Sequence, residues 1–324
     1  MLKCRFGKGE RTLMLRMLPL FAAVLVTWIW SSSYFLNLYA FEQGLGPFTL
    51  SGLRFLIGSV VLALISVARR RRNAKPGSSA STPSARRLPA AMWLLLGITG
   101  YAAAQGLQYA GQSMLEPTQV SLLLSAGNTF VLLVMDRFAL KEALGAGTRI
   151  AASVMIAGVC LFYYPWSFGG ESRAGIVFVL LSCLGYAAHL TFNRKVLLEQ
   201  RAQPFQLTWI PMGIGGTVLL TLGLLFEHTP DFDASLALIV LCLGLVNGAA
   251  AFLLWTWSQR FLTAADSGLI NNLMLAEIAL LEVVVSGKNF EFRQWAAIAV
   301  VSGAVFFQQL RNRPKENRRS SRRE

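Results

Sequence analysis

Charged residues are scarce in this chain. Only 14% of its 324 residues are Asp, Glu, Lys or Arg, whereas 54% are hydrophobic. Soluble domains carry about 25% charged residues, because a surface that faces water needs them. The deficit excludes an ordinary soluble surface, and the hydrophobic content excludes a disordered chain. Lipid must therefore cover much of the folded molecule.

Cysteine is equally sparse. Four residues occur, and their spacing fits neither a disulfide scaffold nor a metal site. The sequence also lacks a phosphate loop, a Gly-x-Ser-x-Gly nucleophile elbow and a His-Glu-x-x-His zinc motif. We therefore expect no metal, no cofactor and no enzymatic activity.

The chain instead contains long stretches without Asp, Glu, Lys or Arg. A helix needs about 20 apolar residues to cross a hydrocarbon core of about 30 Å, and lipid offers the backbone of any other element no hydrogen-bond partner. Most stretches approach that length, and the two short ones become full spans if Arg54, or Glu277 and Glu282, lie inside. The sequence thus predicts an all-α polytopic membrane protein with ten transmembrane helices. The charge-free stretches are 17–41, 55–68, 88–115, 117–135, 150–170, 174–193, 202–226, 234–259, 267–276 and 294–310.

The basic residues choose the orientation. With the N-terminus in the cytoplasm, nearly all of the 30 Lys and Arg fall on the cytoplasmic side, as the positive-inside rule requires. The net charge of +14 therefore marks topology. Neither basic tail offers a folded surface for nucleic acid, so no nucleic-acid partner is expected. We expect an integral protein of the cell (inner) membrane with both termini cytoplasmic and lipid and a small-molecule substrate as partners. A homodimer remains open.

The chain also repeats itself. The segment 42–50 recurs as 199–207, both reading Glu-Gln, then Pro-Phe and Leu at the same spacing, and 94–122 aligns with 241–269. Each half has five predicted spans, an odd number, so the halves must insert in opposite orientations. Such inverted repeats are typical of alternating-access transporters, although a channel could also be built on one. The predicted regions are basic cytoplasmic tails 1–16 and 311–324, a first five-helix repeat 17–164 with a disordered basic cytoplasmic loop 69–87, and a second five-helix repeat 174–310.

Three local motifs carry a family resemblance. They are Trp28-Ile-Trp-Ser-Ser-Ser-Tyr-Phe35 in the first span, Pro47 followed by Arg54-Phe55 at the second, and Leu140-Lys-Glu142 followed by Gly158 after the fourth. In this order they resemble the EamA-type branch of the drug/metabolite transporter superfamily. The resemblance implies small-molecule transport, often export, without naming the cargo.

Ionisable groups inside a span cost about 2.5–3.5 kcal/mol on insertion scales, so each needs a partner or a role. Glu277 lies near mid-span and is a candidate proton-coupling group, with a hydrogen bond to a neighbouring helix as the structural alternative. Glu282 is a second candidate. Five residues apart, the two carboxyl groups point about 140° apart and should face different surroundings. Arg54 would attract an anionic group of the substrate, pair with an intramembrane glutamate, or extend its charged end towards the membrane surface.

Other polar or aromatic side chains inside the spans are candidates for contact with substrate. His189 could relay protons, although a hydrogen-bonded packing role is the simpler interpretation. Trp28 and Trp30 should point to different sides, so at most one of them faces a substrate. The substrate-binding candidates are Trp28, Arg54, Asn128, His189, Asn247, Asn271 and Asn272.

Together these patterns favour a secondary transporter that exports a small polar or amphipathic metabolite by alternating access. Proton coupling through Glu277 is a further hypothesis. The alternative is an integral membrane protein that transports nothing, such as a membrane-embedded enzyme or a sensor.

Overall fold

The computed structural model describes residues 8–73, 88–140, 146–164, 170–199, 202, 205–228, 230, 232–259, 261–262 and 264–320. These residues form helices and connecting turns, with no β-strand among them. One continuous helical stretch corresponds to each predicted span, and two of the stretches contain a π-helical segment. The elements are α1 (Lys8–Glu42), α2 (Pro47–Asn73), α3 (Ala90–Gly97), η1 (Ile98–Gly106), α4 (Leu107–Gln112), α5 (Pro117–Leu140), α6 (Ala146–Tyr163), α7 (Gly170–Leu198), α8 (Gln206–Phe226), α9 (Ala234–Cys242), η2 (Leu243–Ala250), α10 (Ala251–Ser258), α11 (Ala264–Ser286) and α12 (Phe292–Ser320).

Six helical stretches are long and apolar enough to cross a membrane over the described residues. Their outward faces carry large apolar side chains, such as Leu64, Phe226 and Leu238, which a soluble protein would not expose in such number. Two further apolar helices are shorter. The six are Leu18–Glu42, Pro47–Arg69, Ala90–Gln112, Ser172–Leu197, Gln206–Phe226 and Ala234–Ser258, and the shorter two are Ile150–Tyr163 and Phe292–Phe307.

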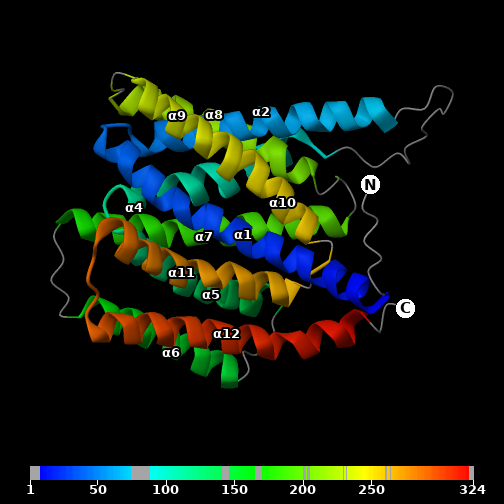
Figure 1. The fold of residues 1–324 in the computed structure, drawn as a ribbon, viewed down its shortest axis with the longest axis vertical. Helices are drawn as coiled ribbons and strands as arrows, with labels where there is room; N and C mark the ends of the chain where they lie inside the picture. Colours follow the sequence, from blue (N-terminus) through cyan, green and yellow to red (C-terminus); the bar gives the residue numbers. More distant parts are fainter. Residues whose placement is uncertain are drawn as a thin grey trace.

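The helices are stacked in layers (Figure 1). α6 and α12 pack against each other at one edge of the bundle, and α2 and α8 pack against each other near the opposite edge. α1 and α7 cross the middle, with α5 and α11 on one side of them. The start of α1, the end of α2 and the end of α12 lie at the same end of the bundle (Figure 1).

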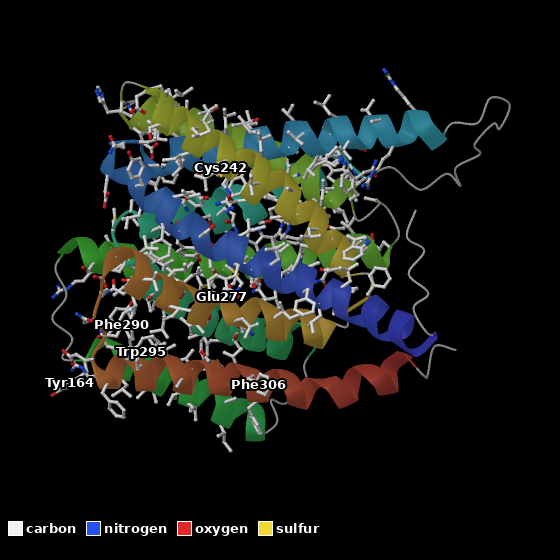
Figure 2. All side chains as sticks on the ribbon, viewed as in Figure 1. Tyr164, Cys242, Glu277, Phe290, Trp295 and Phe306 are labelled. Atoms are coloured by element: carbon white, nitrogen blue, oxygen red, sulfur yellow. The ribbon has the colours of Figure 1, made fainter. Side chains whose placement is uncertain are left out.

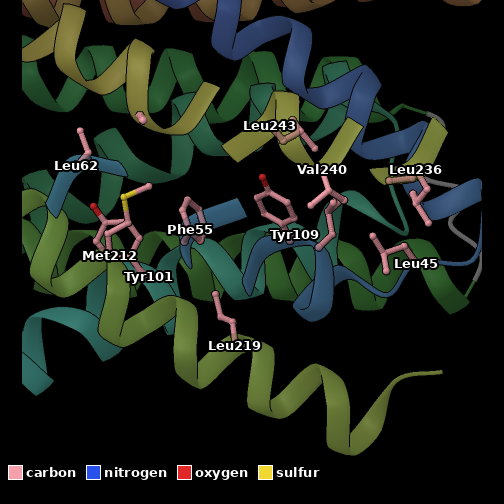
Figure 3. Packing of buried hydrophobic residues seen from close by; sticks show 13 residues of the cluster. Leu45, Phe55, Leu62, Tyr101, Tyr109, Met212, Leu219, Leu236, Val240 and Leu243 are labelled. Atoms are coloured by element: carbon pink, nitrogen blue, oxygen red, sulfur yellow. The ribbon is translucent and has the colours of Figure 1, made fainter. Parts of the chain in front are cut away.

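The largest apolar core lies between α2, α8, α9 and the stretch formed by η1 and α4 (Figure 3). Phe55 and Tyr109 form its centre, and Met212, Leu219 and Leu243 close it from the second half of the chain. A second core joins α6 and α12 to α5 and α11. Each core combines side chains from both halves, so the two repeats do not form separate domains.

α2 and α8 run antiparallel along their whole contact. Close approaches join Thr49 to Gly223, Gly52 to Leu220, and Leu56 to Gly216, so the residue number rises on one helix as it falls on the other. Each approach is at a glycine, where a Cβ would meet the partner helix. The glycines therefore let these two helices pack closely.

Equivalent residues of the two repeats make equivalent contacts. A Cβ added to Gly97 would lie 2.6 Å from Cγ2 of Ile214, and one added to its aligned counterpart Gly244 would lie 2.6 Å from Cγ2 of Ile57. Ile57 and Ile214 are separated along the chain by the same interval as the paired segments 42–50 and 199–207. The contact between a span of one half and a span of the other is thus made twice.

The two π-helical segments also correspond. η1 and η2 fall inside the aligned segments 94–122 and 241–269. η1 begins directly after Gly97, and η2 contains the equivalent Gly244. A π-helical segment within an α-helix has i→i+5 hydrogen bonds, and such segments are frequent at functional sites. Neither segment was predicted, because hydrophobic pattern alone does not distinguish π from α winding.

Helix extends past some of the predicted span limits. α1 begins at Lys8 and α12 continues to Ser320, so helix extends into both predicted tails, and α2 continues to Asn73 into the predicted disordered loop 69–87. Arg and Lys are good helix formers, so a basic run marks where the chain leaves lipid rather than where a helix stops. Residues 74–87 of that loop, and 1–7 and 321–324 of the tails, lie outside the described residues.

Candidate functional site

A polar stripe runs along the buried face of α1. Thr27, Ser31, Tyr34 and Asn37 are spaced by three or four residues, which places them on one side of a helix, and all four are buried. The first two donate to Glu277 of α11, and the last two hydrogen-bond with α4. The stripe therefore runs from Glu277 to α4, the helix whose Tyr109 bonds to Arg54.

Glu277 of α11 is held by two hydroxyl groups of α1. Thr27 Oγ1 donates to its Oε1 and Ser31 Oγ donates to its Oε2, both at 2.9 Å. The side chain is buried in the middle of the bundle (Figure 2). No cation pairs with it among the residues that the structure describes. Its partners are neutral, so a proton or another cation can bind this carboxyl group without displacing a salt bridge.

Arg54 of α2 is the one buried cation in the described part of the chain. Its Nη1 donates to the hydroxyl of Tyr109, and its guanidinium lies 5.7 Å from the ring centre of Phe55 and 5.9 Å from that of Tyr109. Its Nε is buried and has no hydrogen-bond partner among the residues that the structure describes. The expected alternative, an ion pair with an intramembrane glutamate, is not formed among the described residues.

Two hydrogen bonds beside Arg54 join α1 to α4. Gln108 Nε2 donates to the Tyr34 hydroxyl at 3.3 Å, and Asn37 Nδ2 donates to Gln112 Oε1 at 2.7 Å. Tyr34 lies within electrostatic range of Arg54 and Tyr109. The α4 side chains on either side of Tyr109 in the chain are thus neutral and bond to neutral groups of α1.

Glu282, about one turn and a half after Glu277 on α11, has different surroundings, as predicted. Its Oε2 accepts from the backbone N–H of Thr118 at 2.8 Å, in the first turn of α5, and its Oε1 lies 3.5 Å from Lys288 Nζ. Lys288 also pairs with Glu116, and burial lowers the pKa of its amine from the ordinary value. A carboxylate at a helix N-terminus is stabilised by the helix dipole. Glu282 therefore fastens α11 to the start of α5.

A similar cap on α2 was not predicted from sequence. Glu227, just after α8, accepts from the backbone N–H groups of Phe48 at 2.7 Å and Thr49 at 2.8 Å, and from Thr49 Oγ1 at 2.7 Å. Glu227 is far from Phe48 in the chain, so no local pattern could have shown this bond. The folded arrangement of α2 and α8 creates it.

Two further candidates lie at contacts between helices. Asn247 of η2 donates from Nδ2 to the backbone carbonyl of Ile29, and the backbone carbonyl of Asn247 accepts from Trp30 Nε1 at 3.1 Å. His189 of α7 has Nδ1 3.1 Å from the carbonyl oxygen of Leu96, and its ring fits over Gly100 of η1. In each case a side-chain ring and a π-helical segment meet.

The remaining candidates do not gather at one point. Trp28 is exposed, whereas Trp30 packs between Phe252 and Trp255 with ring centres 5.4 and 5.3 Å away, so the two tryptophans do point to different sides. Asn128 has a buried Oδ1 without a partner. In α11, Asn271 is exposed and Asn272 is half-buried. Their roles stay predictions.

Apolar helices of membrane-spanning length, with hydrogen-bonded ionisable groups held between them, define an integral membrane protein. The chain belongs to the EamA-like transporter family, whose model matches it twice, over residues 17–164 and 173–308. The resemblance found in the sequence is thereby confirmed, and a transporter family agrees with the expectation that the chain is not an enzyme. The two matches cover the two halves that share the internal repeat.

Individual relatives agree with this assignment. The uncharacterized transporter YdfC of Bacillus subtilis (strain 168) is 25% identical over 243 residues, which are 74% of each chain. A solved crystal structure of a protein superposes with a TM-score of 0.61 at 17% identity, covering 90% of this chain and 96% of that one. The second similarity concerns the fold alone.

Proposed function

We propose that this protein is a secondary transporter that exports a small polar or amphipathic metabolite by alternating access. Membership of a transporter family and similarity to a transporter support the general class. The specific mechanism is supported by the internal arrangement of the helices.

All ten helical stretches cross the membrane in this proposal, as two inverted five-helix repeats. The observation that carries it is the antiparallel packing of α2 against α8, helices that occupy corresponding places in the two halves. The matched contacts of Gly97 with Ile214 and Gly244 with Ile57 add a second pair of equivalent spans. Two related packings that are inverted in the membrane can open to opposite sides around a central site.

The protein lies in the cell membrane with both termini in the cytoplasm. The ends of α1, α2 and α12 that share one end of the bundle also carry the basic segments of the sequence. The positive-inside rule places such an end in the cytoplasm.

Protons couple to transport at Glu277. The carboxyl group is buried between α1 and α11, and within the described part of the chain the hydroxyl groups of Thr27 and Ser31 satisfy its oxygens. Protonation changes the hydrogen-bonding capacity of a carboxyl from acceptor only to donor and acceptor. The change acts directly on the contact between helices from opposite halves.

The test begins with metabolite profiling of cells that overexpress the chain, followed by flux of the depleted metabolites in proteoliposomes. We expect at least one metabolite to move in protein-containing vesicles and its flux to depend on pH. Glu277→Gln should abolish the pH dependence and leave binding intact, and Glu291→Gln, at an exposed site, should change neither. Unchanged pH dependence in Glu277→Gln would reject Glu277 as the proton site. No flux across the panel, with turnover of a lipid by the purified protein, would reject transport.

A further inference from the structure

Arg54 is a buried cation without an acidic partner among the described residues. A guanidinium stays charged at every physiological pH, so burial cannot be relieved by loss of a proton. Only 7% of the residue is exposed, and no acidic side chain pairs with it in the described part of the chain. Buried charges in proteins are normally paired, because removal of water from a lone ion is costly.

The groups around Arg54 satisfy it only in part. Tyr109 accepts one hydrogen bond from Nη1, whereas Nε has no partner among the described residues although it is buried. The rings of Phe55 and Tyr109 contribute attraction to the cation but no hydrogen-bond acceptor in its plane. An unused donor therefore remains on a rigid fork whose geometry matches two oxygens of one group.

We propose that Arg54 binds the carboxylate of the transported molecule, and that the substrate is a small monocarboxylate. This inference rests on the proposed transport function and names the substrate class. One buried positive charge balances one negative charge, and its contacts in the described part of the chain, the Tyr109 hydroxyl and the rings of Phe55 and Tyr109, add no second cation. A phosphate dianion would leave one charge unbalanced in the same surroundings.

The test is thermal unfolding of the purified full chain with pairs of acids and their neutral amides. Lactate, benzoate, phenylacetate and hexanoate are compared with lactamide, benzamide, phenylacetamide and hexanamide at equal ionic strength, with sodium phosphate as the dianion. We expect at least one acid to raise the unfolding temperature while its amide does not. Arg54→Gln should remove that shift, and Arg54→Lys, which keeps the charge but loses the fork, should reduce it.

The matched control is Arg69→Gln. Arg69 is on the same helix and its guanidinium also lies over a ring, 5.6 Å from the centre of Phe205, but the side chain is exposed. This variant should keep the full acid-specific shift. Without ligand, Arg54→Gln should unfold at the same temperature as the wild type or higher, because it removes an unpaired buried charge.

Opposite results overturn the proposal. In the wild type, these results are acids and amides that change the unfolding temperature alike, or phosphate that raises it as much as the acids do. In the ligand-free variants, the contrary result is a lower unfolding temperature for Arg54→Gln together with a wild-type unfolding temperature for Arg54→Lys. If Arg54→Gln cannot be purified, an undiminished acid-specific shift of the unfolding temperature in Arg54→Lys also overturns the proposal.

Vesicle flux separates the two proposals. Transport that prefers no acid over its amide rejects the carboxylate site alone. Acid-specific binding without flux rejects transport alone.

Discussion

At the scale of single residues, the partner of each buried ionisable group decides what that group can do. Glu277 and Glu282 lie on the same helix, yet the first accepts only from hydroxyl groups and the second accepts from a helix N-terminus and lies near Lys288. In the proposed mechanism, the first arrangement allows Glu277 to gain and lose a proton. The second needs the negative charge to remain in place.

Glu282→Gln should therefore lower stability without changing the pH dependence of transport. We expect a loss of about 1–3 kcal/mol in the free energy of unfolding, because a charge-assisted bond to Thr118 and the attraction to Lys288 are weakened. Thermal unfolding in detergent measures the loss, and vesicle flux at several pH values measures the coupling. A shifted pH profile with unchanged stability would contradict the structural role.

Glu227→Ala should destabilise the protein by about 1–2 kcal/mol, because three hydrogen bonds at the start of α2 are lost. Glu291→Ala is the matched control, since that acidic side chain is exposed and its ion pair with Arg293 is superficial. Thermal unfolding of both variants checks the difference. Equal effects would show that the cap on α2 contributes nothing measurable.

At the scale of elements, small residues set the distance between helices. The chain places glycine where α2 meets α8 and where each meets the π-containing stretch of the other half. Without a strong hydrophobic force between helices in lipid, close packing supplies much of the attraction between them. The same device therefore appears at corresponding places in both repeats.

Gly97→Ala and Gly244→Ala should each lower the free energy of unfolding by about 1–3 kcal/mol, because the new methyl group would overlap Ile214 or Ile57. Gly303→Ala in α12 is the control, since nothing lies within 4 Å of its added Cβ. That control should leave stability unchanged or raise it slightly. Similar losses in all three variants would mean that helix flexibility, not close packing, determines the effect.

At the scale of the whole molecule, the two halves combine into one body. The cores mix side chains from both repeats, and Glu277 bonds from the second half to α1 of the first. A motion of one half relative to the other must break or slide these contacts together. The proposed alternating access is thus a property of the entire bundle.

The inverted orientation predicts opposite labelling of equivalent positions. Glu42 and Glu199 open the two copies of the repeated segment, and both side chains are exposed. In a cysteine-free background, Glu42→Cys should react with a membrane-impermeant maleimide in intact cells. Glu199→Cys should react only after the cells are permeabilised. Labelling of both from the same side would contradict the inversion.

The sequence alone determined which stretches are apolar, where basic charge accumulates and which segments repeat, because these follow from composition and spacing along the chain. It also determined that Glu277 and Glu282 differ in surroundings, because helical rotation separates their directions. Only the tertiary structure decided their partners. Thr27 and Ser31 for Glu277, Thr118 for Glu282, and Glu227 for α2 are all distant in sequence, and a bond between distant residues depends on how helices cross. The structure likewise left Arg54 without an acidic partner among the described residues, since the packing of α2 against α4 brings Tyr109 to it instead of a carboxylate.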